Sequence, residues 1–493
     1  MSDEAARRRR RAREVLAGGA GWRRRVGLVA GAALAGGMLL APAPAGLSDA
    51  GWRTAAVGVL MAVWWMSEAL PIPVTSLLPI LLFPLLGVAA VGPAAAPYAH
   101  ELIFLFLGGF LIARGIERWG LHRRIALAVV ERMGTRPSRL VAGFMVASAF
   151  LSLWISNTAT SLLMLPIALS LLTLLGGAAE EDRRRFAVVL LLGIAYACSL
   201  GGMGTLIGTP GNALFAAFVA ETYGRQVGFA DWMLVGLPVV VVGLPLTHAV
   251  LTRVAFPLRL AEIPGGSAFL AAERDALGPM SGAEKRVAAV FAATAAAWIA
   301  RPLLAGALPG LTDTGVALAG ALALFLLPGG RGGGEALLDW ESARDLPWGV
   351  LLLFGGGLSL AAAVRDTGLA EWIGGLVAGA GALPAPLLLL LVLAVILLLT
   401  ELTSNTATVA AFLPVLASLA AATGQEPLAL LAGATLAASG AFMLPVATPP
   451  NAIVFASGHV SIAQMARAGC LLNLLFLLLV AAACWWLAPL ALG

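Results

Sequence analysis

Charged residues are scarce in this sequence, and their scarcity excludes a soluble fold. Asp, Glu, Lys and Arg make up only 12% of the 493 residues, whereas apolar residues make up 60%. Apolar runs of about 17 to 25 residues recur from Val26 almost to the last residue, and each is long enough to cross a hydrocarbon layer roughly 30 Å thick. The sequence therefore predicts an all-α polytopic membrane protein in a lipid bilayer.

Residues that carry enzyme chemistry are also few. The three cysteines and four histidines have no metal-ligand or disulfide spacing. The sequence offers neither a nucleophile with its base nor a His-Glu-x-x-His helix, so we expect no enzyme. The net charge of +5 comes from basic residues between apolar runs rather than on one patterned face, so we expect no nucleic-acid partner.

The chain does contain an internal duplication. Ser156-Asn157-Thr158 and Ser404-Asn405-Thr406 lie 248 residues apart, and each is followed by Ala-Thr. Farther on, Gly208-Thr209-Pro210-Gly211-Asn212-Ala213 corresponds to Ala447-Thr448-Pro449-Pro450-Asn451-Ala452 at an offset of 239 residues. Each half thus has two polar breaks inside hydrophobic runs, which is the pattern of a transporter with a midplane binding site.

Hydropathy predicts about eleven transmembrane helices, and we interpret two further apolar stretches as re-entrant hairpins. The hairpins, 139–175 and 385–422, are apolar on either side of the Ser-Asn-Thr tripeptides, and we expect each to enter and leave by one side, with its freed backbone groups facing a wet cavity. The predicted crossings are 26–45, 54–70, 74–91, 102–117, 186–219, 232–252, 287–304, 313–328, 348–364, 428–456 and 468–489.

The charge distribution predicts the orientation of these segments. With these crossings, most of the 31 Lys and Arg residues fall on the same side of the membrane as the N-terminus. This favours a cytoplasmic N-terminus and an external C-terminus in the cytoplasmic membrane. Five crossings per repeat make the second copy run upside down, so an inverted-topology repeat is expected. The predicted domains are a basic cytoplasmic tail (1–25), a first span with its connection (26–53), a first repeat (54–256), a cytoplasmic linker (257–284) and a second repeat (285–493).

The polar breaks carry hydroxyl and amide groups but no ionisable side chain. Hard cations such as sodium bind Ser and Thr hydroxyls, Asn carbonyl oxygens and the carbonyls of an unwound turn. Ser152 and Thr400 each precede a tripeptide by one helical turn and lie on the same face. Glu401 follows Thr400 directly, so it has either a purely structural role or a role in supporting Thr400 at the site.

An anion fits the same place. Helices that begin just after Asn157-Thr158 and Asn405-Thr406, and near Pro210 and Pro449, would aim free N–H groups and the positive ends of their dipoles inward. Since no Arg or Lys lies at these breaks, a bound cation would provide much of the positive charge that a divalent anion needs. Anion affinity should then depend steeply on the cation.

At these residues the chain resembles the divalent anion/sodium symporter family of sodium-coupled di- and tricarboxylate and sulfate transporters. The resemblance rests on the paired tripeptides, on Thr448-Pro449-Pro450-Asn451, and on the stretches Trp64 to Pro71 and Pro347 to Gly357. It implies a homodimer whose protomers each have a scaffold domain and a transport domain, the latter moving across the membrane in an elevator-type step. Gly211 departs from the family, which usually has a second proline there.

The resemblance also implies site residues. Two sodium ions would serve as coupling ions, the first at Ser152, Ser156, Asn157 and Gly208 and the second at Thr400, Ser404, Asn405 and Ala447. The substrate carboxylates would meet Asn157, Thr158, Thr209, Pro210, Asn405, Thr406, Thr448 and Pro449.

The leading hypothesis is a sodium-coupled importer of C4-dicarboxylates such as succinate, malate or fumarate. Alternatives within the class are citrate or sulfate symport and cation-independent dicarboxylate exchange. An anion channel could use similar helix ends but would need a continuous pore. The sequence leaves the anion and the sodium stoichiometry open.

Overall fold

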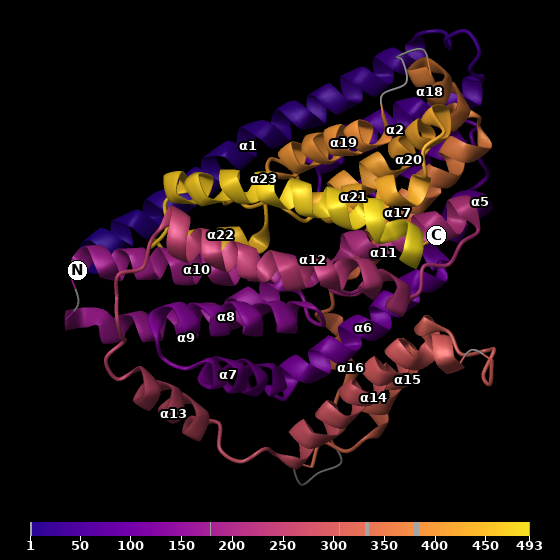
Figure 1. Ribbon diagram of the computed structural model, residues 1–493. Helices are drawn as coiled ribbons and strands as arrows, with labels where there is room; N and C mark the ends of the chain where they lie inside the picture. Colours follow the sequence, from indigo (N-terminus) through magenta and orange to yellow (C-terminus); the bar gives the residue numbers. More distant parts are fainter. Residues whose placement is uncertain (1, 178, 305, 331–334, 379–383, 493) are drawn as a thin grey trace.

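The protein is built from helices. A computed structural model describes residues 2–177, 179–304, 306–330, 335–378 and 384–492, and these ranges contain helices, turns and one isolated bridge between Pro328 and Ala336 but no strand (Figure 1). The expectation of an all-α fold is confirmed for the part of the chain that is described.

The helices follow one another with short connections. Those of the first half are α1 (Ser2–Leu40), α2 (Asp49–Ser67), α3 (Ile72–Thr75), α4 (Leu78–Leu85), α5 (Val91–Ala95), α6 (Glu101–Arg118), α7 (Leu121–Met133), α8 (Pro137–Ser152), α9 (Asn157–Thr173), α10 (Glu180–Gly202), α11 (Pro210–Tyr223) and α12 (Phe229–Ala249), which a π-helical stretch (Val250–Ala255) extends. Those of the linker and second half are α13 (Gly266–Ala276), α14 (Gly282–Leu304), α15 (Asp313–Leu326), α16 (Trp340–Arg344), α17 (Trp348–Asp366), α18 (Leu369–Ala378), α19 (Ala385–Thr400), α20 (Asn405–Thr423), α21 (Pro427–Ala438), α22 (Pro449–Ala456), α23 (Ile462–Trp486) and α24 (Ala488–Ala491).

Membrane-spanning helices are well represented. In the described residues, eight helical stretches are long and apolar enough to cross a bilayer, and five shorter apolar helices accompany them. The eight are Val91–Arg118, Asn157–Gly177, Glu180–Gly202, Phe229–Ala255, Gly282–Leu304, Trp348–Asp366, Asn405–Thr423 and Ile462–Ala491. The number of eleven crossings stays a prediction.

Two segments near the N-terminus differ from the expected pattern. The span expected over 74–91 is not one helix: α3 is a single turn and α4 has eight residues with Pro79 in its first turn and Pro84 inside it. Proline lacks an N–H and fixes its backbone angle, so it interrupts the helical ladder. Conversely, α1 runs without a break through the expected tail and into the expected first span.

The duplication is visible in the helix boundaries. At the offset of 248 residues α6 corresponds to α17, α7 to α18, α8 to α19 and α9 to α20, with starting points that agree within one residue. In Figure 1 the hairpin α8–α9 opens toward the left edge of the bundle and α19–α20 toward the right edge. The two copies therefore run in opposite directions, as an inverted repeat requires.

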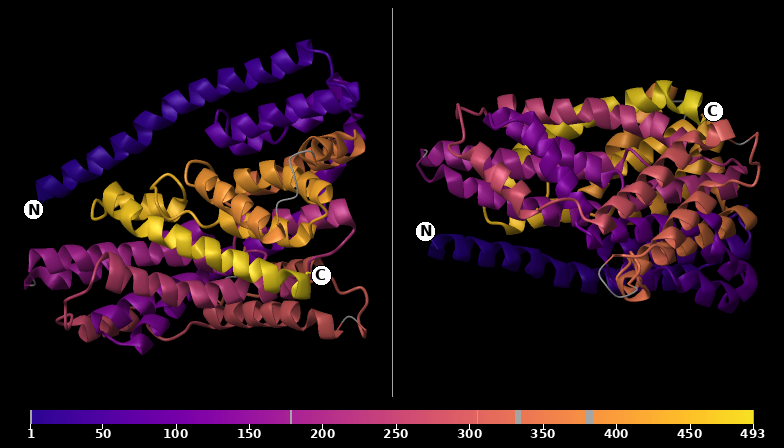
Figure 2. Two further views of the ribbon diagram at one scale, coloured as in Figure 1. Left: turned by 45° about the horizontal axis from the view of Figure 1, so that its top comes forward. Right: turned by 90° about the horizontal axis from the view of Figure 1, so that it is seen from below.

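The bundle is organised around α10. Every residue from Phe186 to Gly202 is buried, and a helix that is apolar on all sides packs in the interior of a protein. Helix α10 packs against α8, α9, α12 and α22. On the outside, α1 lies along α2 on one face, and the pair α14–α15 lies on another (Figure 2).

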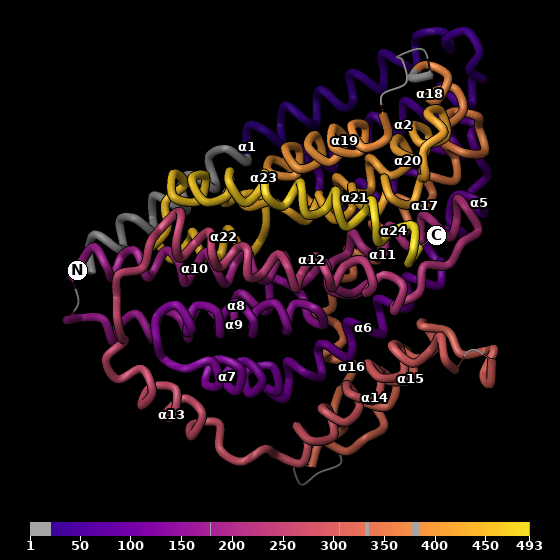
Figure 3. The backbone as a smooth tube through the Cα atoms, viewed as in Figure 1, coloured from indigo at the N-terminus to yellow at the C-terminus, as the bar shows by residue number. Residues whose placement is uncertain are grey.

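The linker between the repeats contains α13 and is held by ion pairs. Figure 3 shows the chain leaving the end of α12, passing through α13 and reaching α14. Arg123 and Glu131 of α7 lie 2.8 Å from Glu273 and 2.7 Å from Arg274, respectively. The linker is thus fixed to α7, the helix that links α6 to the first hairpin.

Candidate functional site

The tip of the first hairpin collects oxygen atoms that lack hydrogen-bond donors. Ser152 ends α8 and Asn157 begins α9, and neither Ser152 Oγ nor Asn157 Oδ1 has a hydrogen-bond partner among the described residues. A methyl group at Gly202 would lie 2.7 Å from Asn157 Oδ1 and 3.2 Å from the Gly208 oxygen, and one at Gly208 would lie 2.9 Å from the Ser152 carbonyl oxygen. Only glycine allows this close approach of hairpin and break.

These oxygens are of the kind that a hard cation takes as ligands. A hydroxyl, an amide oxygen and carbonyl oxygens carry partial negative charge without a fixed one. Leaving them buried without a partner costs free energy, and a cation among them would offset that cost. Ser156 is used differently, because its side chain is exposed and caps α9 by accepting a hydrogen bond from the N–H of Ala159 at 3.2 Å.

The second hairpin has a related but different arrangement. Thr400 ends α19 and Asn405 begins α20, and Thr400 Oγ1 lies 2.8 Å from Asn405 Oδ1 and 2.6 Å from the carbonyl oxygen of Ala438. Since a hydroxyl has one proton, it can donate to only one of these oxygens at a time. Ser404 precedes α20 without capping it through its side chain, and Ala447 is buried at the end of the facing break.

Both breaks are closed by an asparagine in the same register. Asn212 donates through Nδ2 to the carbonyls of Gly202 at 3.0 Å and Thr205 at 2.7 Å, ten and seven residues back. Asn451 donates through Nδ2 to the carbonyls of Ala441 at 3.1 Å and Leu444 at 3.0 Å, again ten and seven residues back. Both side chains are fully buried. The duplicated sequence thus folds into duplicated hydrogen bonding at the two breaks.

The residues expected to meet an anion all lie at helix N-termini. The first turns of α9 and α20 contain Asn157-Thr158 and Asn405-Thr406, and the N-caps Thr209 and Thr448 precede Pro210 in α11 and Pro449 in α22. Thr209 and Thr448 have nearly the same backbone angles, φ −141° and ψ 143° against φ −140° and ψ 151°. The hairpin residues are partly exposed. The N–H groups of their first turns, which lack partners within the helix, can therefore bind an anion.

The carboxylate of Glu401, which directly follows α19, holds the second break in place. Its carboxylate, 4% exposed, accepts hydrogen bonds from the backbone N–H groups of Phe442 at 2.8 Å, Met443 at 2.9 Å and Leu444 at 3.0 Å, and from Asn473 Nδ2 at 2.8 Å. All four partners are donors, which is the pattern that an ionised carboxylate satisfies. A negative charge therefore lies next to Thr400.

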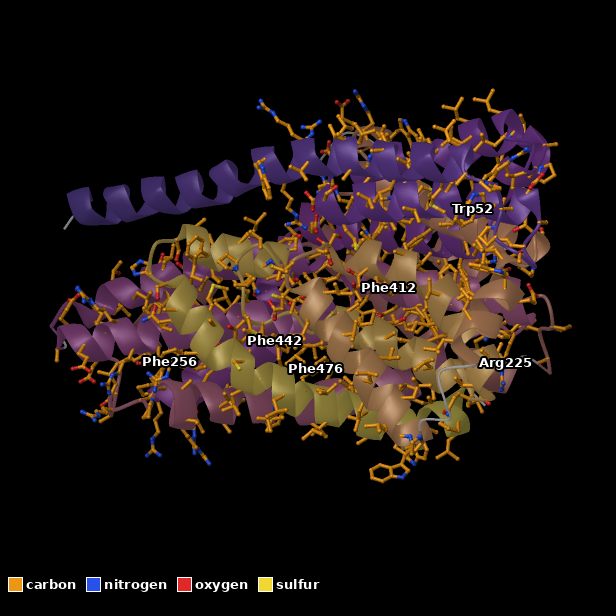
Figure 4. All side chains as sticks on the ribbon, turned by 90° about the horizontal axis from the view of Figure 1, so that it is seen from above. Trp52, Arg225, Phe256, Phe412, Phe442 and Phe476 are labelled. Atoms are coloured by element: carbon orange, nitrogen blue, oxygen red, sulfur yellow. The ribbon has the colours of Figure 1, made fainter. Side chains whose placement is uncertain are left out.

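The two halves of the site are packed into each other. Helix α22 of the second repeat packs against α9 of the first, and α11 of the first packs against α20 of the second. Tyr196 of α10 donates a hydrogen bond to the carbonyl of Phe442 at 2.6 Å. Figure 4 shows Phe442 beside Phe476 of α23, and their ring centroids are 5.5 Å apart. Each hairpin therefore packs against the helix that follows the break of the other repeat, in addition to helices of its own repeat.

Residues 23–492 match the protein family described as "Sodium:sulfate symporter transmembrane region". The chain belongs to this symporter family. The resemblance inferred from the repeated motifs is thereby confirmed, and the symporter is an integral membrane transporter and not an enzyme.

A relative of known name supports this assignment, and two solved structures share the fold. The symporter is 41% identical over 477 residues to the sodium-dependent dicarboxylate transporter SdcS of Staphylococcus aureus (strain MRSA252), covering 95% of this chain and 92% of that one. The MtrF structure of Neisseria gonorrhoeae has a TM-score of 0.57 at 15% identity, covering 83% of this chain and 84% of that one. The Alcanivorax borkumensis YdaH transporter has a TM-score of 0.52 at 16% identity, covering 95% and 97%. At such identities the two structures show a shared fold alone.

Sequence reasoning overlooked several residues that shape the symporter's site. Gly202 brings the first break against the hairpin tip, and Thr205 accepts a hydrogen bond from the N–H of Gly208 at 3.1 Å while donating to the carbonyl of Leu153 at 2.5 Å. Tyr196 donates to a carbonyl of the second break, and Asn473 donates to the Glu401 carboxylate, which in turn holds that break. A polar residue inside an apolar run was the available signal for Thr205 and Asn473.

Proposed function

We propose that this symporter imports C4-dicarboxylates such as succinate, malate or fumarate together with sodium. The observation that supports the proposal most directly is the set of unpaired oxygens at Ser152 and Asn157 next to the Gly202 and Gly208 main chain. That set suits a sodium ion, and the adjacent helix N-termini suit a carboxylate. The name of the Staphylococcus aureus relative supports the same pairing of sodium with a dicarboxylate.

In the proposed mechanism two sodium ions bind first, one at each hairpin tip. The first tip would use Ser152, Ser156, Asn157 and Gly208, with Ser156 contributing through its main chain because its hydroxyl caps α9. The second would use Thr400, Ser404, Asn405 and Ala447. The positive charge of the ions then raises the affinity for the anion at the first turns of the four helices, so cation and anion bind together.

The proposed transport step is an elevator-type movement in a homodimer. The two hairpins, taken as re-entrant, would move with α10, α11, α21 and α22, because these elements pack into one another. The N-terminus would face the cytoplasm and the C-terminus the exterior, as the distribution of Lys and Arg favours. Inverted repeats with a midplane site support such alternating access.

Uptake by the purified symporter in proteoliposomes tests the function. Labelled succinate should accumulate with a sodium gradient and not with potassium or lithium in its place. Uptake that ignores the sodium gradient and requires internal dicarboxylate would replace symport by exchange. Competition with unlabelled succinate, citrate, 2-oxoglutarate and sulfate identifies the anion, and stronger competition by citrate or sulfate would overturn the C4-dicarboxylate assignment.

Two matched variants test the site. Asn157→Ala and Asn405→Ala should each abolish uptake while the protein elutes as the folded wild type does, because each removes a proposed sodium ligand and an anion contact. Thr423→Ala is the control, since Thr423 lies at the far end of α20 and only bonds to carbonyls of its own helix. Near-normal uptake by either asparagine variant would remove the site assignment.

A further inference from the structure

A basic hollow lies at the end of the bundle where α10 and α23 begin. It measures about 400 Å³, which is large enough to hold a small polar group, and it is lined by Glu181, Arg184 and Arg185 of α10, Phe256 after the π-helical stretch, and Ala463, Gln464 and Arg467 of α23. Figure 4 shows Phe256 toward this end of the molecule and Phe442 nearer its middle. The hollow is separate from the hairpin tips.

The three arginines do not have equal partners. On α10, Arg184 pairs with Glu180 at 2.8 Å and Arg185 pairs with Glu181, both at a spacing of four residues. Such exposed pairs are worth only about 0.5 kcal/mol each and exchange readily. Arg467 has no carboxylate partner among the described residues, and its guanidinium lies 5.7 Å from the ring centroid of Phe256. Arginines from two helices thus converge on one hollow with donors to spare.

An apolar track continues from the hollow along α23. Arg467 is exposed, and the residues one, two and three turns farther on the same face, Cys470, Leu474 and Leu478, are exposed as well. The side chains of Leu474 and Leu478 are 57% and 53% exposed. At 1.5 Å per residue the track from Arg467 to Leu478 is about 16 Å long, close to half of a hydrocarbon core of about 30 Å.

This combination matches the chemistry of one anionic phospholipid. Guanidinium groups bind phosphate oxygens in a bidentate manner, and basic hollows between membrane helices take phosphate head groups. A soluble phosphate would use the arginines but not the exposed leucines. We propose that this hollow binds the phosphate head group of an anionic phospholipid whose acyl chains lie along the exposed face of α23. With the proposed orientation the lipid belongs to the cytoplasmic leaflet.

Thermal unfolding of the full chain in detergent, titrated with lipid, tests the proposal. Phosphatidylglycerol should raise the unfolding temperature of the wild type, and phosphatidylcholine at the same concentration should not. The triple variant Arg184→Gln, Arg185→Gln and Arg467→Gln should need on the order of 100-fold more phosphatidylglycerol for the same shift, since each basic residue near a lipid surface contributes several-fold to affinity.

Two further variants keep the outcome interpretable. Arg467→Gln alone leaves no acidic partner unpaired and should weaken the lipid response by about fivefold, even if the triple variant does not fold. Arg139→Gln removes an exposed arginine at the start of α8, outside the hollow, and should respond as the wild type does. Equal responses to the two lipids, or an Arg467→Gln variant that responds like the wild type, would overturn the proposal. Stabilisation by inorganic phosphate at the concentrations effective for phosphatidylglycerol would assign the hollow to a soluble phosphate instead.

Discussion

Replacing Glu401 should cost the protein more stability than replacing a solvent-exposed carboxylate. Its side chain is the sole acceptor described for the N–H groups of Met443 and Leu444, and it also accepts from Phe442 and Asn473. A buried donor without a partner costs about 1 to 3 kcal/mol. Glu401→Leu leaves three backbone donors and one amide unpaired, and after partial relaxation we expect a loss of about 3 to 6 kcal/mol in the free energy of unfolding.

A graded series separates this account from a simple loss of packing. Glu401→Gln keeps one acceptor oxygen but turns an NH2 group toward N–H donors, so its loss should be about 2 kcal/mol. Glu371→Leu is the control, because Glu371 is exposed on α18 and should change stability by less than about 0.5 kcal/mol. Denaturant titration in mixed micelles gives the three values.

The series also has a functional readout. A carboxylate beside Thr400 should strengthen cation binding at the second hairpin, so Glu401→Gln should raise the sodium concentration for half-maximal uptake about tenfold if the charge contributes about 1.4 kcal/mol. Glu401→Leu with wild-type stability would refute the hydrogen-bond account. An unchanged sodium dependence in a folded Glu401→Gln variant would refute the electrostatic one.

Three other changes test particular contacts. Asn212→Ala and Asn451→Ala should each lower the free energy of unfolding by about 2 to 4 kcal/mol. The two values should agree within about 1 kcal/mol, since both side chains donate to the carbonyls ten and seven residues back and Asn212 adds only a long contact of 3.4 Å to the carbonyl of Met203. Values far apart would mean that the two breaks are not equivalent. A Cβ at Gly211 would lie 3.3 Å from Val409 Cγ2, so Gly211→Ala should lower the free energy of unfolding by about 1 kcal/mol, and by less in a Val409→Ala background. Thermal unfolding of the double-mutant cycle measures the difference, and strictly additive effects would argue against the contact. Arg23 donates hydrogen bonds to the carbonyl of Leu402 at the second hairpin tip and to that of Met66 at 2.5 Å. Arg23→Gln should therefore speed amide hydrogen exchange over 401–404 at least about threefold. Unchanged exchange would show that the contact does not restrain the tip.

The sequence located the site's main elements because two copies of one pattern restrict each other. The tripeptides and the Thr-Pro breaks predicted where helices would start, and α9, α20, α11 and α22 begin at those residues. Capping by Ser156 and Thr448 and the fixed backbone angles of Pro210 and Pro449 act locally. Such features can be read from neighbouring residues, so they were accessible without a structure.

Contacts between distant segments could not be read in this way. Glu401 looked ambiguous in sequence because its three backbone partners lie about forty residues away, in a break whose path depends on packing. The span expected over 74–91 was wrong as a single helix because hydropathy counts apolar residues and ignores the missing N–H groups of Pro79 and Pro84. The close approach of Gly202 to Asn157 likewise depends on how two helices meet.

The crossed packing of the repeats has a consequence for how such a chain could arise and be divided. Helix α11 packs against α20, and α22 packs against α9. Neither half alone therefore contains all the helices against which its own hairpin packs. A single-copy forerunner would therefore have needed an antiparallel partner of the same sequence, and gene fusion would have made that pairing permanent. Division of the present chain within 257–284 should yield two fragments that do not transport when they are separate and that reassemble only when they are produced together.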